Sequence, residues 1–493
     1  MIICNFSVNY VSFLSLEKYI LAVCGMTKYY LLGVGGIAMS SLAGLLKQKG
    51  HKVSGSDSGV FGPSLAILKK LRIPYADGYD ANNIKKFKPD LVIIGNGISR
   101  GNIELEYVLN ERILFSSLPD IFHKEFVRNK KAIVITGTSG KTTTTALISW
   151  ILEALKMHPT TLVGGLTMGK NELPLYGQGN YVVVEGDEYN SSFFDIGPKF
   201  LHYQPFIGII NNIEHDHVDI YPQLSDVKRV FNKFVSLVPQ QGLLIVNRGN
   251  PNAMEASRNA RSSVQSFGKN GDIIARNISF STDGLVFDTY FHGQKLGQIK
   301  SQLFGHHNVE NILATLLVTR ALKLPFSQVA KAIENFPGIK RRLETIYANG
   351  QIKIIDDFGH NPQKVAASVS AIRKHNLHSR LIAVFEPRTA SSRRKVFQST
   401  YAECFRGADL VYLSQPFNKK ALKADELFSS EKLARDLNKK NIQAHVLENA
   451  DQIVAHLIAL LLKKKANQTI ILVMSSGSFD NIHTKLITKL SAA

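Results

Sequence analysis

A glycine-rich segment between a strand pattern and a helix pattern constrains this chain more than any other feature. It reads Thr136-Gly137-Thr138-Ser139-Gly140-Lys141-Thr142-Thr143, after an apolar strand candidate at 132–135 and before a helix pattern over 144–155. Such a turn directs backbone N–H groups inward at a helix N-terminus, where partial positive charge favours phosphate. Lys141 adds a full charge for the phosphates, and the Thr142 hydroxyl suits a Mg²⁺ ion on the nucleotide. The segment predicts an ATP site over 137–143, although its two glycines stand closer together than in the usual phosphate-loop motif; the plain alternative is a glycine-rich turn.

The composition bounds the class of protein. At 493 residues, 44% of them hydrophobic, the chain is long enough for two to four globular domains with their own cores. It contains no run of 18 apolar residues, so we expect no membrane insertion. The three cysteines, Cys4, Cys24 and Cys404, show neither metal-binding spacing nor a disulfide framework, which fits a reducing cytoplasm.

The charge balance is unusual. A net charge of +20, from 59 basic and 39 acidic residues, attracts polyanions and makes nucleic acid one interpretation. The basic residues are nevertheless spread along the chain, with only short clusters such as 130–131, 340–342 and 463–465. Anionic small substrates, or a generally basic proteome, explain the excess equally well. We therefore expect no nucleic-acid partner.

The chain divides into an N-terminal extension over 1–26 and three blocks over 27–127, 128–337 and 338–493. The extension is mildly apolar but has no basic start, and Glu17 and Lys18 interrupt it, so it is a poor signal peptide. The foldable pattern begins at Thr27, directly after Met26. We hypothesise that Met26 is the natural start or that the extension is a loosely packed appendage.

Strand and helix patterns alternate through all three blocks. Strand candidates are 29–32, 52–57, 91–94, 113–115, 132–135, 181–184, 207–210, 243–246, 352–355, 381–385, 410–413, 444–447 and 469–473. Helix patterns are clearest over 144–155, after Ser225 and over 308–322. This alternation argues for parallel-rich sheets with helices on both faces. We predict an α/β fold in three domains: a Rossmann-like N-terminal domain, a central phosphate-loop ATPase-type domain and a Rossmann-like C-terminal domain.

The first block opens like a βαβ unit. The turn after its first strand pattern contains Gly33, Gly35 and Gly36, and its second strand pattern ends in Ser56 and Asp57. Taken alone, this arrangement predicts a dinucleotide-binding site with the carboxylate on a ribose. The glycine pattern by itself is a weak signal, so the ligand must be decided by the rest of the chain.

In the second block, two strand patterns end in groups that suit a metal ion. Glu185 ends one buried strand pattern, and His217 lies shortly after the next, in the segment Asn-Asn-Ile-Glu-His-Asp-His. The carboxyl ends of parallel strands share one edge of a sheet, where phosphate loops also lie. Glu185, His217 and Thr142 therefore predict a Mg²⁺ site on the triphosphate. For His217 alone, a hydrogen-bonded surface histidine is the simpler interpretation.

Three further clusters are candidates for ligand contact. Asn308 and Asn311 lie on one helix face at a spacing of three, although helix capping also explains Asn308. Arg342, in a short basic run, suits phosphate but also a solvated charged turn. Asp357 and His360 follow a strand pattern, in the position where an α/β domain presents ligand contacts.

Together these motifs resemble those of the Mur ligase family, the ATP-dependent enzymes that form amide bonds of peptidoglycan. The motifs GTSGKTT, VEGDE, NNIEHDH, GHHNVEN, IKRRLE and DDFGHNP occur in the family's order, and the resemblance spans nearly the whole chain from Thr27. It implies ATP and Mg²⁺ as cofactors. The catalytic residues that it implies are Lys141, Glu185, His217, Arg342 and Asp357. The nucleotide contacts that it implies are 137–143, Asn308, Asn311, Arg342 and Asp357.

The resemblance also assigns a task to each domain. The first would bind a UDP-sugar through Gly33, Gly35, Gly36, Ser56 and Asp57. The second would bind ATP and metal, and the third would bring the amino component, with contacts from His360 and Arg388. A lactyl carboxylate of UDP-N-acetylmuramic acid would attack the γ-phosphate, and the amine would then displace phosphate from the acyl phosphate. Fixed charges would stabilise both steps, and domain closure would exclude water.

Within the family, four segments resemble the branch that adds the tripeptide L-Ala-γ-D-Glu-meso-diaminopimelate to UDP-N-acetylmuramic acid in cytoplasmic peptidoglycan recycling. They are 188–195, 199–203, 385–388 and 474–479. Arg388, Arg393 and Arg394 would bind the tripeptide's carboxylates, because the planar guanidinium pairs with carboxylate, although a solvated basic loop explains them too. The alternative is the sister enzyme of peptidoglycan synthesis, which adds free L-alanine. Two positions depart from the pattern: Asn361 replaces a usual histidine, and Ser476 a more usual asparagine.

Two other classes of function compete with this interpretation. A dinucleotide-dependent oxidoreductase would use 33–57 but leaves Lys141, Glu185 and His217 without a purpose. A non-catalytic module that binds UDP-sugar or nucleic acid is disfavoured because those three residues are intact. The sequence leaves the oligomeric state and the third residue of the peptide open.

Overall fold

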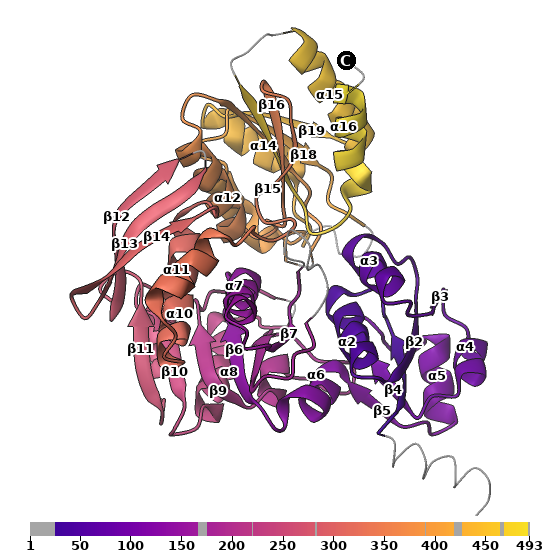
Figure 1. Cartoon of the computed structure of the whole chain (residues 1–493). Coiled ribbons are helices and arrows are strands. Elements are labelled where there is room, and N and C mark those ends of the chain that lie inside the picture. The colour runs from indigo at the N-terminus through magenta and orange to yellow at the C-terminus, as the bar shows by residue number, and fades with distance from the viewer. Residues whose placement is uncertain are drawn as a thin grey trace, which may run out of the picture.

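A computed structural model describes residues 25–165, 175–218, 220–281, 283–389, 391–418, 426–463 and 468–491. Three α/β domains follow one another along the chain, each built on its own sheet (Figure 1). The three sheets fall within the predicted blocks, although the exact boundaries stay predictions. All but the last two residues of the predicted extension over 1–26 lie outside the described ranges. Within those ranges, none of the helices combines the length and the apolar character needed to cross a membrane.

The N-terminal domain has a five-stranded parallel sheet in the order β3-β2-β1-β4-β5. Its elements are β1 (Lys28–Leu32), α2 (Ile37–Gln48), β2 (Lys52–Asp57), α3 (Gly62–Lys70), β3 (Tyr75–Asp77), α4 (Ala81–Phe87), β4 (Leu91–Ile94), α5 (Ile103–Asn110), β5 (Phe115–Ser117) and α6 (Leu118–Phe122). The strand order reverses at β1, which makes the loop after β1 a ligand-binding position of a doubly wound sheet. The predicted Rossmann-like architecture is confirmed, with β5 starting two residues later than expected.

The central domain has nine strands in the order β14-β13-β12-β11-β10-β9-β6-β8-β7. Its parallel part comprises β6 (Lys131–Thr136), β7 (Thr160–Leu162), β8 (Tyr181–Glu185), β9 (Pro205–Ile210), β10 (Leu243–Asn247) and β11 (Ser263–Phe267). Its helices are α7 (Lys141–Ala154), α8 (Leu224–Leu237), α9 (Pro251–Ser257), α10 (His306–Ala321) and α11 (Phe326–Glu334). Because β6 pairs with both β8 and β9, the chain segments that follow these three strands leave the same edge of the sheet.

An antiparallel meander extends this sheet, and the sequence did not predict it. Its strands are β12 (Ile273–Ser281), β13 (Gly284–Phe291) and β14 (Gln294–Ser301). Polar and apolar residues alternate along it, which is weaker evidence of a strand than the apolar runs of buried parallel strands. The meander rises from the central domain toward the C-terminal domain (Figure 1). There Ser281 O bonds to His375 Nδ1 at 2.6 Å, and Gly305 N–H donates to His375 Nε2 at 3.3 Å.

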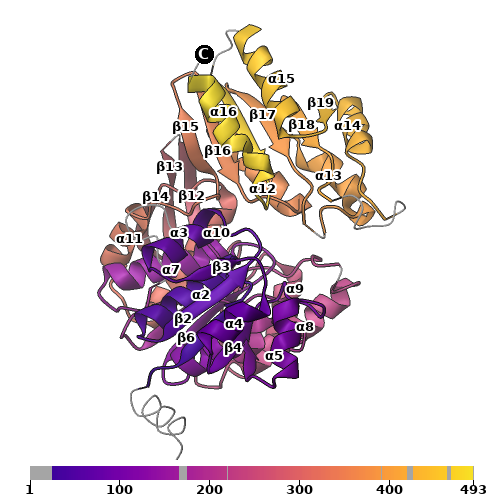
Figure 2. The same ribbon diagram turned by 90° about the vertical axis from the view of Figure 1, so that its right-hand side faces the viewer.

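The C-terminal domain has a six-stranded sheet in the order β15-β16-β20-β17-β18-β19. Its strands are β15 (Glu344–Ala348), β16 (Ile352–Asp357), β17 (Arg380–Phe385), β18 (Leu410–Ser414), β19 (Gln443–Leu447) and β20 (Thr469–Met474), of which only β15 pairs antiparallel. Its α-helices are α12 (Pro362–His375), α13 (Gln398–Cys404), α14 (Ser430–Lys439), α15 (Ala450–Lys463) and α16 (Ile482–Ser491). Helices α12 to α14 cover one face of the sheet, and α15 and α16 cover the other (Figure 2).

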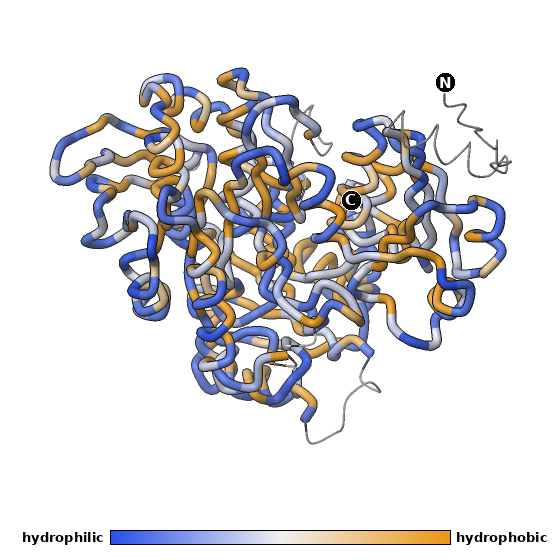
Figure 3. The backbone as a smooth tube through the Cα atoms, turned by 90° about the horizontal axis from the view of Figure 1, so that it is seen from below, coloured by the Kyte–Doolittle hydropathy of each residue, from blue (hydrophilic) through white to orange (hydrophobic). Residues whose placement is uncertain are grey.

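Apolar segments fill the interior of the molecule and polar ones form most of its outer loops (Figure 3). One core runs without interruption from the N-terminal into the central domain, through Phe122 of α6 and Tyr203, whose rings lie 5.7 Å apart. The burial of such large apolar surfaces fixes these two domains on one another. The edges of the sheets that carry the predicted ligand residues are therefore held in a defined arrangement.

Candidate active site

The phosphate loop leaves the end of β6 and enters α7 as predicted. Gly140 has a φ of +85°, a left-handed conformation that glycine adopts without steric cost. A Cβ atom at Gly140 would lie 2.5 Å from Asn311 Oδ1 and 2.7 Å from Asn211 Nδ2. Asn212 also holds the loop, because its Oδ1 accepts from Ser139 N–H at 2.8 Å. The loop is thus fixed from two sides before any ligand binds.

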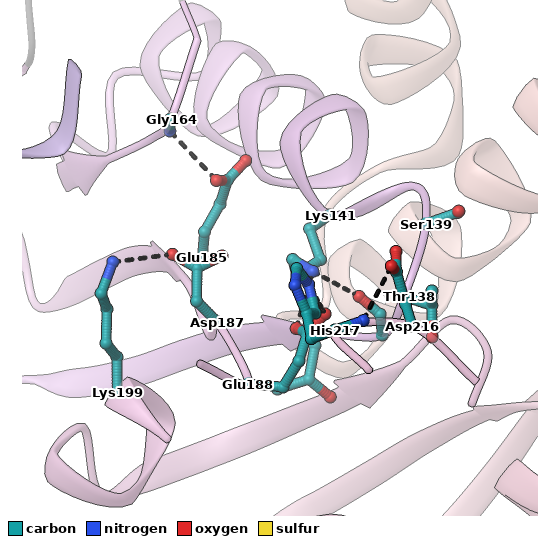
Figure 4. A network of polar contacts seen from close by, with 12 residues as sticks. Thr138, Ser139, Lys141, Gly164, Glu185, Asp187, Glu188, Lys199, Asp216 and His217 are labelled. Carbon is teal, nitrogen blue, oxygen red and sulfur yellow. Dashed lines mark hydrogen bonds and ion pairs between the residues drawn. The ribbon is translucent and has the colours of Figure 1, made fainter. Parts of the chain in front are cut away.

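Lys141 starts α7 and is held by an ionic cluster (Figure 4). Its Nζ lies 2.8 Å from Glu188 Oε2 and 2.6 Å from Gly137 O. The other oxygen of Glu188 lies 3.2 Å from His217 Nε2. Burial alone would raise the pKa of Glu188, but Lys141 and His217 together lower it to about 2. Burial and Lys141 lower the pKa of His217, but Glu188 and Asp216 raise it by more, and Glu188 links the three side chains into one triad.

Glu185 stands apart from this triad. Its Oε2 accepts from Gly164 N–H at 3.1 Å, whereas its Oε1 is buried and has no hydrogen-bond partner among the described residues. Burial and the nearby Asp187 raise the pKa of Glu185. The Thr142 hydroxyl opposes this rise, which places it beside the carboxylate. An unpartnered carboxylate oxygen next to a hydroxyl is the hard oxygen donor set that Mg²⁺ prefers, so these residues fit the implied metal.

The predicted metal ligands are thus only partly assembled. Glu185 and Thr142 lie together, but His217 is paired with Glu188. Asp187, between the two glutamates in sequence, is held by Lys199 at 3.2 Å. His217 would have to leave Glu188 to bind a metal with Glu185.

A cavity of about 430 Å³ opens beside the loop, between the central and C-terminal domains. All the predicted nucleotide contacts except Gly137 line it, namely 138–143, Asn308, Asn311, Arg342 and Asp357. Phe267, Phe304 and His307 line it as well and provide an aromatic surface. Its size is within the range of sites for nucleotide-sized ligands.

Asn308 and Asn311, from the first turns of α10, are joined to one another and to the loop. Asn311 Nδ2 donates to Asn308 Oδ1 at 2.9 Å, and Asn311 Oδ1 accepts from Thr144 Oγ1 at 3.3 Å. Asn308 Nδ2 donates to Phe304 O at 2.7 Å. Asn311 therefore braces the phosphate loop in addition to facing the cavity.

Arg342 and Asp357 bring the C-terminal domain to the cavity. An Arg342 nitrogen lies 3.4 Å from Thr142 Oγ1, across the domain boundary. Asp357 accepts hydrogen bonds from the N–H groups of Leu343 and Gly359 and from Ser368 Oγ, at 2.8 to 3.0 Å. Burial raises the pKa of Asp357, and Arg342 opposes the rise. Both residues line the cavity together with the phosphate loop.

A second contact across the boundary uses residues that the sequence did not pair. Asn361 is the N-cap residue of α12, and its Nδ2 donates to Asp216 Oδ2 at 2.7 Å. Asp216 Oδ1 accepts from His217 N–H at 2.8 Å. Asn361 thus ties the start of α12 to the segment that carries His217. Burial lowers the pKa of the adjacent His360 well below its ordinary value, so its imidazole is neutral.

The predicted UDP-sugar loop is braced from within its own domain. Asp57 Oδ2 accepts from Gly35 N–H at 2.7 Å, and a Cβ atom at Gly35 would clash with that carboxylate. The Ser56 hydroxyl is buried and bonds to Glu104. Gly36 is the N-cap of α2 and has no side-chain cap, so the helix N-terminus faces the loop. The backbone of Gly33 to Gly36 suits a diphosphate, whereas Ser56 points into the interior.

The three candidate arginines of the C-terminal domain differ in their environments. Arg388 lies 3.3 Å from Glu386 and 3.8 Å above the Phe417 ring. Arg394 pairs with Glu426, and Arg393 donates to the carbonyl of Phe417. Arg393 and Arg394 therefore order their own loop, as the plain interpretation of a basic loop expects, and Arg388 is likewise held by its own neighbours.

Sequence reasoning missed Glu188 as the partner of Lys141 and His217. Its signal was present, because it stands three residues after Glu185 in the same acidic run. The run offers three carboxylates, and only the fold shows that Asp187 pairs with Lys199 and Glu188 with the loop lysine.

The fold and this cavity define a three-domain α/β enzyme that activates a substrate with a nucleotide. Family models match most of the chain: "Mur ligase family, catalytic domain" over 28–128, "Mur ligase middle domain" over 135–319, and "Mur ligase, glutamate ligase domain" over 341–477. The chain belongs to the Mur ligase family, and it is an ATP-dependent carbon–nitrogen ligase.

Individual relatives fall in two branches of the family. The chain is 33% identical to the UDP-N-acetylmuramate–L-alanyl-γ-D-glutamyl-meso-2,6-diaminoheptandioate ligase of Haemophilus influenzae, over 94% of this chain and 99% of the relative. It is 32% identical to the UDP-N-acetylmuramate–L-alanine ligase of Clostridium acetobutylicum, over 94% and 98%. The crystal structure of a murein peptide ligase from Psychrobacter arcticus superimposes with a TM-score of 0.71, at 26% identity, over 95% of this chain and 99% of that one.

Proposed function

We propose that this enzyme joins the tripeptide L-Ala-γ-D-Glu-meso-diaminopimelate to UDP-N-acetylmuramic acid in peptidoglycan recycling. The observation that carries the proposal is the full-length similarity to the Haemophilus influenzae ligase, whose name states that tripeptide. The segment Phe385 to Arg388, at the carboxyl end of β17, supports it, because a carboxylate-rich acceptor needs a fixed cation and the Arg388 guanidinium can supply one.

The proposed reaction has two steps. First, the lactyl carboxylate attacks the γ-phosphorus of ATP, ADP leaves, and an acyl phosphate forms. Second, the amine of the acceptor attacks the acyl carbon, phosphate leaves, and the amine loses a proton as the amide forms. Negative charge develops on phosphate oxygens in the first step, and on the acyl oxygen and the departing phosphate in the second.

The residues of the cavity supply the stabilisation that these steps need. Lys141 exchanges its contact with Glu188 for phosphate oxygens, and Arg342 approaches the same phosphates from the other domain. Fixed cations in a site that excludes water stabilise developing charge at little reorganisation cost. A bound Mg²⁺, held by Glu185, Thr142 and a released His217, would neutralise phosphate charge.

The N-terminal loop of Gly33 to Gly36 completes the proposed site. Its helix N-terminus favours a diphosphate of any kind, and membership of a ligase family selects a UDP-sugar over a dinucleotide. Closure of the C-terminal domain over the cavity protects the acyl phosphate from hydrolysis. The alanine ligase of Clostridium acetobutylicum gives the second candidate, with L-alanine as the acceptor.

A direct competition distinguishes the two acceptors. Purified enzyme with ATP, Mg²⁺ and UDP-N-acetylmuramic acid is offered L-alanine and the tripeptide in parallel, and product formation is measured. We expect the tripeptide to be ligated faster. Faster ligation of L-alanine would assign the enzyme to the other branch.

Arg388 sharpens the same experiment. Arg388→Ala should raise the tripeptide KM at least tenfold and leave the ATP KM nearly unchanged, since a bidentate guanidinium–carboxylate contact is lost. Arg394→Ala, which removes an arginine already paired with Glu426, is the matched control and should change neither constant. An equal rise of both KM values in Arg388→Ala would place Arg388 outside the acceptor site.

A further inference from the structure

Three cationic side chains line the cavity, and the sequence and the family motifs account for only two of them. Lys141 comes from the phosphate loop and Arg342 from the start of the C-terminal domain. The third is Lys364, in the first turn of α12. Lys141 is paired with Glu188, and the cavity wall also carries the carboxylates of Glu214, Glu310 and Asp357. The question is therefore which of the three cations lacks a carboxylate of its own.

The side chain of Lys364 is oriented by a neutral histidine. Its Nζ lies 3.3 Å from His360 Nε2. The other ring nitrogen, Nδ1, lies 2.8 Å from Phe358 O and must carry the proton, because a carbonyl only accepts. Nε2 is then an acceptor for the Lys364 ammonium. His360 thus positions a lysine, and its predicted contact with the substrate stays a prediction.

Within the described part of the chain, no carboxylate lies at ion-pair distance from the Lys364 ammonium. Two carboxylates act on it from further away: Asp216, which Asn361 engages at 2.7 Å, and Glu188, which is paired with Lys141 and His217. Burial lowers the pKa of Lys364 to about 8, Asp216 opposes this, and the fields of Lys141 and Arg342 add to the lowering. A half-buried ammonium without a counter-ion is costly, and an anion in the cavity would remove that cost.

A lysine at the N-terminus of α12 is also unfavourable for the stability of that helix. The first turn of α12 contains no acidic residue, and a lysine there opposes the helix dipole. A purely structural lysine would be expected at the other end, where Arg373 and Lys374 lie. The cost at the N-terminus is balanced when a phosphate occupies the cavity.

We propose that Lys364 is a phosphate-binding residue of this ligase, which the C-terminal domain places on the γ-phosphate of ATP opposite Lys141. This inference rests on the ATP-dependent function proposed above. Lys364 would contact the γ-phosphate in bound ATP and the same phosphate after its transfer to the carboxylate. ADP lacks that group, so the contribution of Lys364 should distinguish the two nucleotides.

Nucleotide titration calorimetry on the full-length enzyme with Mg²⁺ tests this inference. ADP and the non-hydrolysable β,γ-imido analogue of ATP are titrated into wild type, Lys364→Met and Lys364→Arg. Lys374→Met is the matched control, because Lys374 is an exposed lysine on the same helix. We expect Lys364→Met to weaken the ATP analogue at least tenfold and ADP less than threefold, Lys364→Arg to recover most of the loss, and Lys374→Met to match wild type.

Two results would overturn the inference. One is unchanged affinity for the ATP analogue in folded Lys364→Met. The other is an equal loss for both nucleotides, which would make Lys364 a structural residue. Should Lys364→Met fail to fold, Lys364→Gln is titrated against the same criteria. If wild-type enzyme binds neither nucleotide, the proposed function fails and not the role of Lys364.

Discussion

Two buried carboxylates in this molecule have the same types of partner, a lysine and a histidine, but lie in different surroundings. Glu188, at the phosphate loop, lies 2.8 Å from a lysine and 3.2 Å from a histidine. Glu125, in the N-terminal domain, lies 2.7 Å from Lys49 and 3.2 Å from His51. In both clusters burial alone would raise the pKa of the glutamate, and its partners lower that pKa to about 2.

The two clusters have similar geometry, but their surroundings differ. Lys49 also donates to the Glu125 carbonyl and lies 5.3 Å from the Phe126 ring, and Tyr29 donates to the carboxylate. Every polar group named in that cluster is paired with another group of the protein. At the phosphate loop, Lys141 lines a cavity, and Glu185 beside it keeps an unpartnered oxygen. An ionic triad therefore does not identify a site; open space and unpaired neighbours do.

The largest expected difference follows from exchanging each lysine for alanine. Lys141→Ala should lower kcat at least a hundredfold, about 3 kcal/mol, because a contact to charge in the transition state is lost. Lys49→Ala should leave kcat unchanged and lower the melting temperature, since its contacts are internal. Ligation kinetics and thermal denaturation of both variants measure the contrast. Near-normal ligation by Lys141→Ala would contradict the prediction that the phosphate loop binds ATP.

The second test concerns the metal. Glu185→Gln and His217→Ala should each raise the Mg²⁺ concentration needed for half-maximal acyl-phosphate formation by at least tenfold, since each removes a proposed ligand. UDP-N-acetylmuramic acid should still bind, because its proposed site lies in the N-terminal domain. Calorimetry with the UDP-sugar provides the control. Loss of UDP-sugar binding in a folded variant would contradict the separation of the two sites.

The last test is a pH dependence of stability at Glu125, which should not affect catalysis. Its pKa falls from an ordinary 4.5 to about 2 on folding, so its contribution is present above pH 4.5 and is lost as the pH falls toward 2. Glu125→Gln should cost about 2 kcal/mol of unfolding free energy at neutral pH, after allowance for solvent screening. Urea denaturation at several pH values should show wild type and variant converging below about pH 4. A constant difference down to pH 2 would show that packing, and not charge, makes the contribution.

Apolar strand runs and the phosphate loop allowed most of the fold to be predicted from the sequence. Thirteen strand candidates correspond to observed strands, because parallel strands buried on both faces are continuous apolar runs. The meander of β12 to β14 was missed because its strands alternate and remain half exposed. Boundaries such as that of β5 shifted by two residues, since local pattern does not fix where pairing begins.

The candidate site divides in the same way. Residues attached to one motif, such as Lys141 and Asn311, could be placed from local sequence because the motif itself fixes their surroundings. Pairings across long separations could not, because they depend on how the domains dock. The contact of Asp216 with Asn361 and the choice of Glu188 for Lys141 belong to this second kind. Lys364 entered the site only because α12 docks beside the loop.

Helix α12 is tied to the central domain at both ends, through Asn361 to Asp216 and through His375 to Ser281 and Gly305. A rigid body held at two points keeps one free rotation, about the line that joins them, and here the contact of Arg342 with Thr142 must open before that rotation can occur. Breaking either contact leaves buried polar groups without hydrogen-bond partners, which costs about 1–3 kcal/mol of stability for each group. The C-terminal domain should therefore rotate as a rigid body about the axis of α12. Lys364 belongs to α12, so it stays at the cavity during this rotation. Strand β19, at the far edge of the sheet, moves furthest.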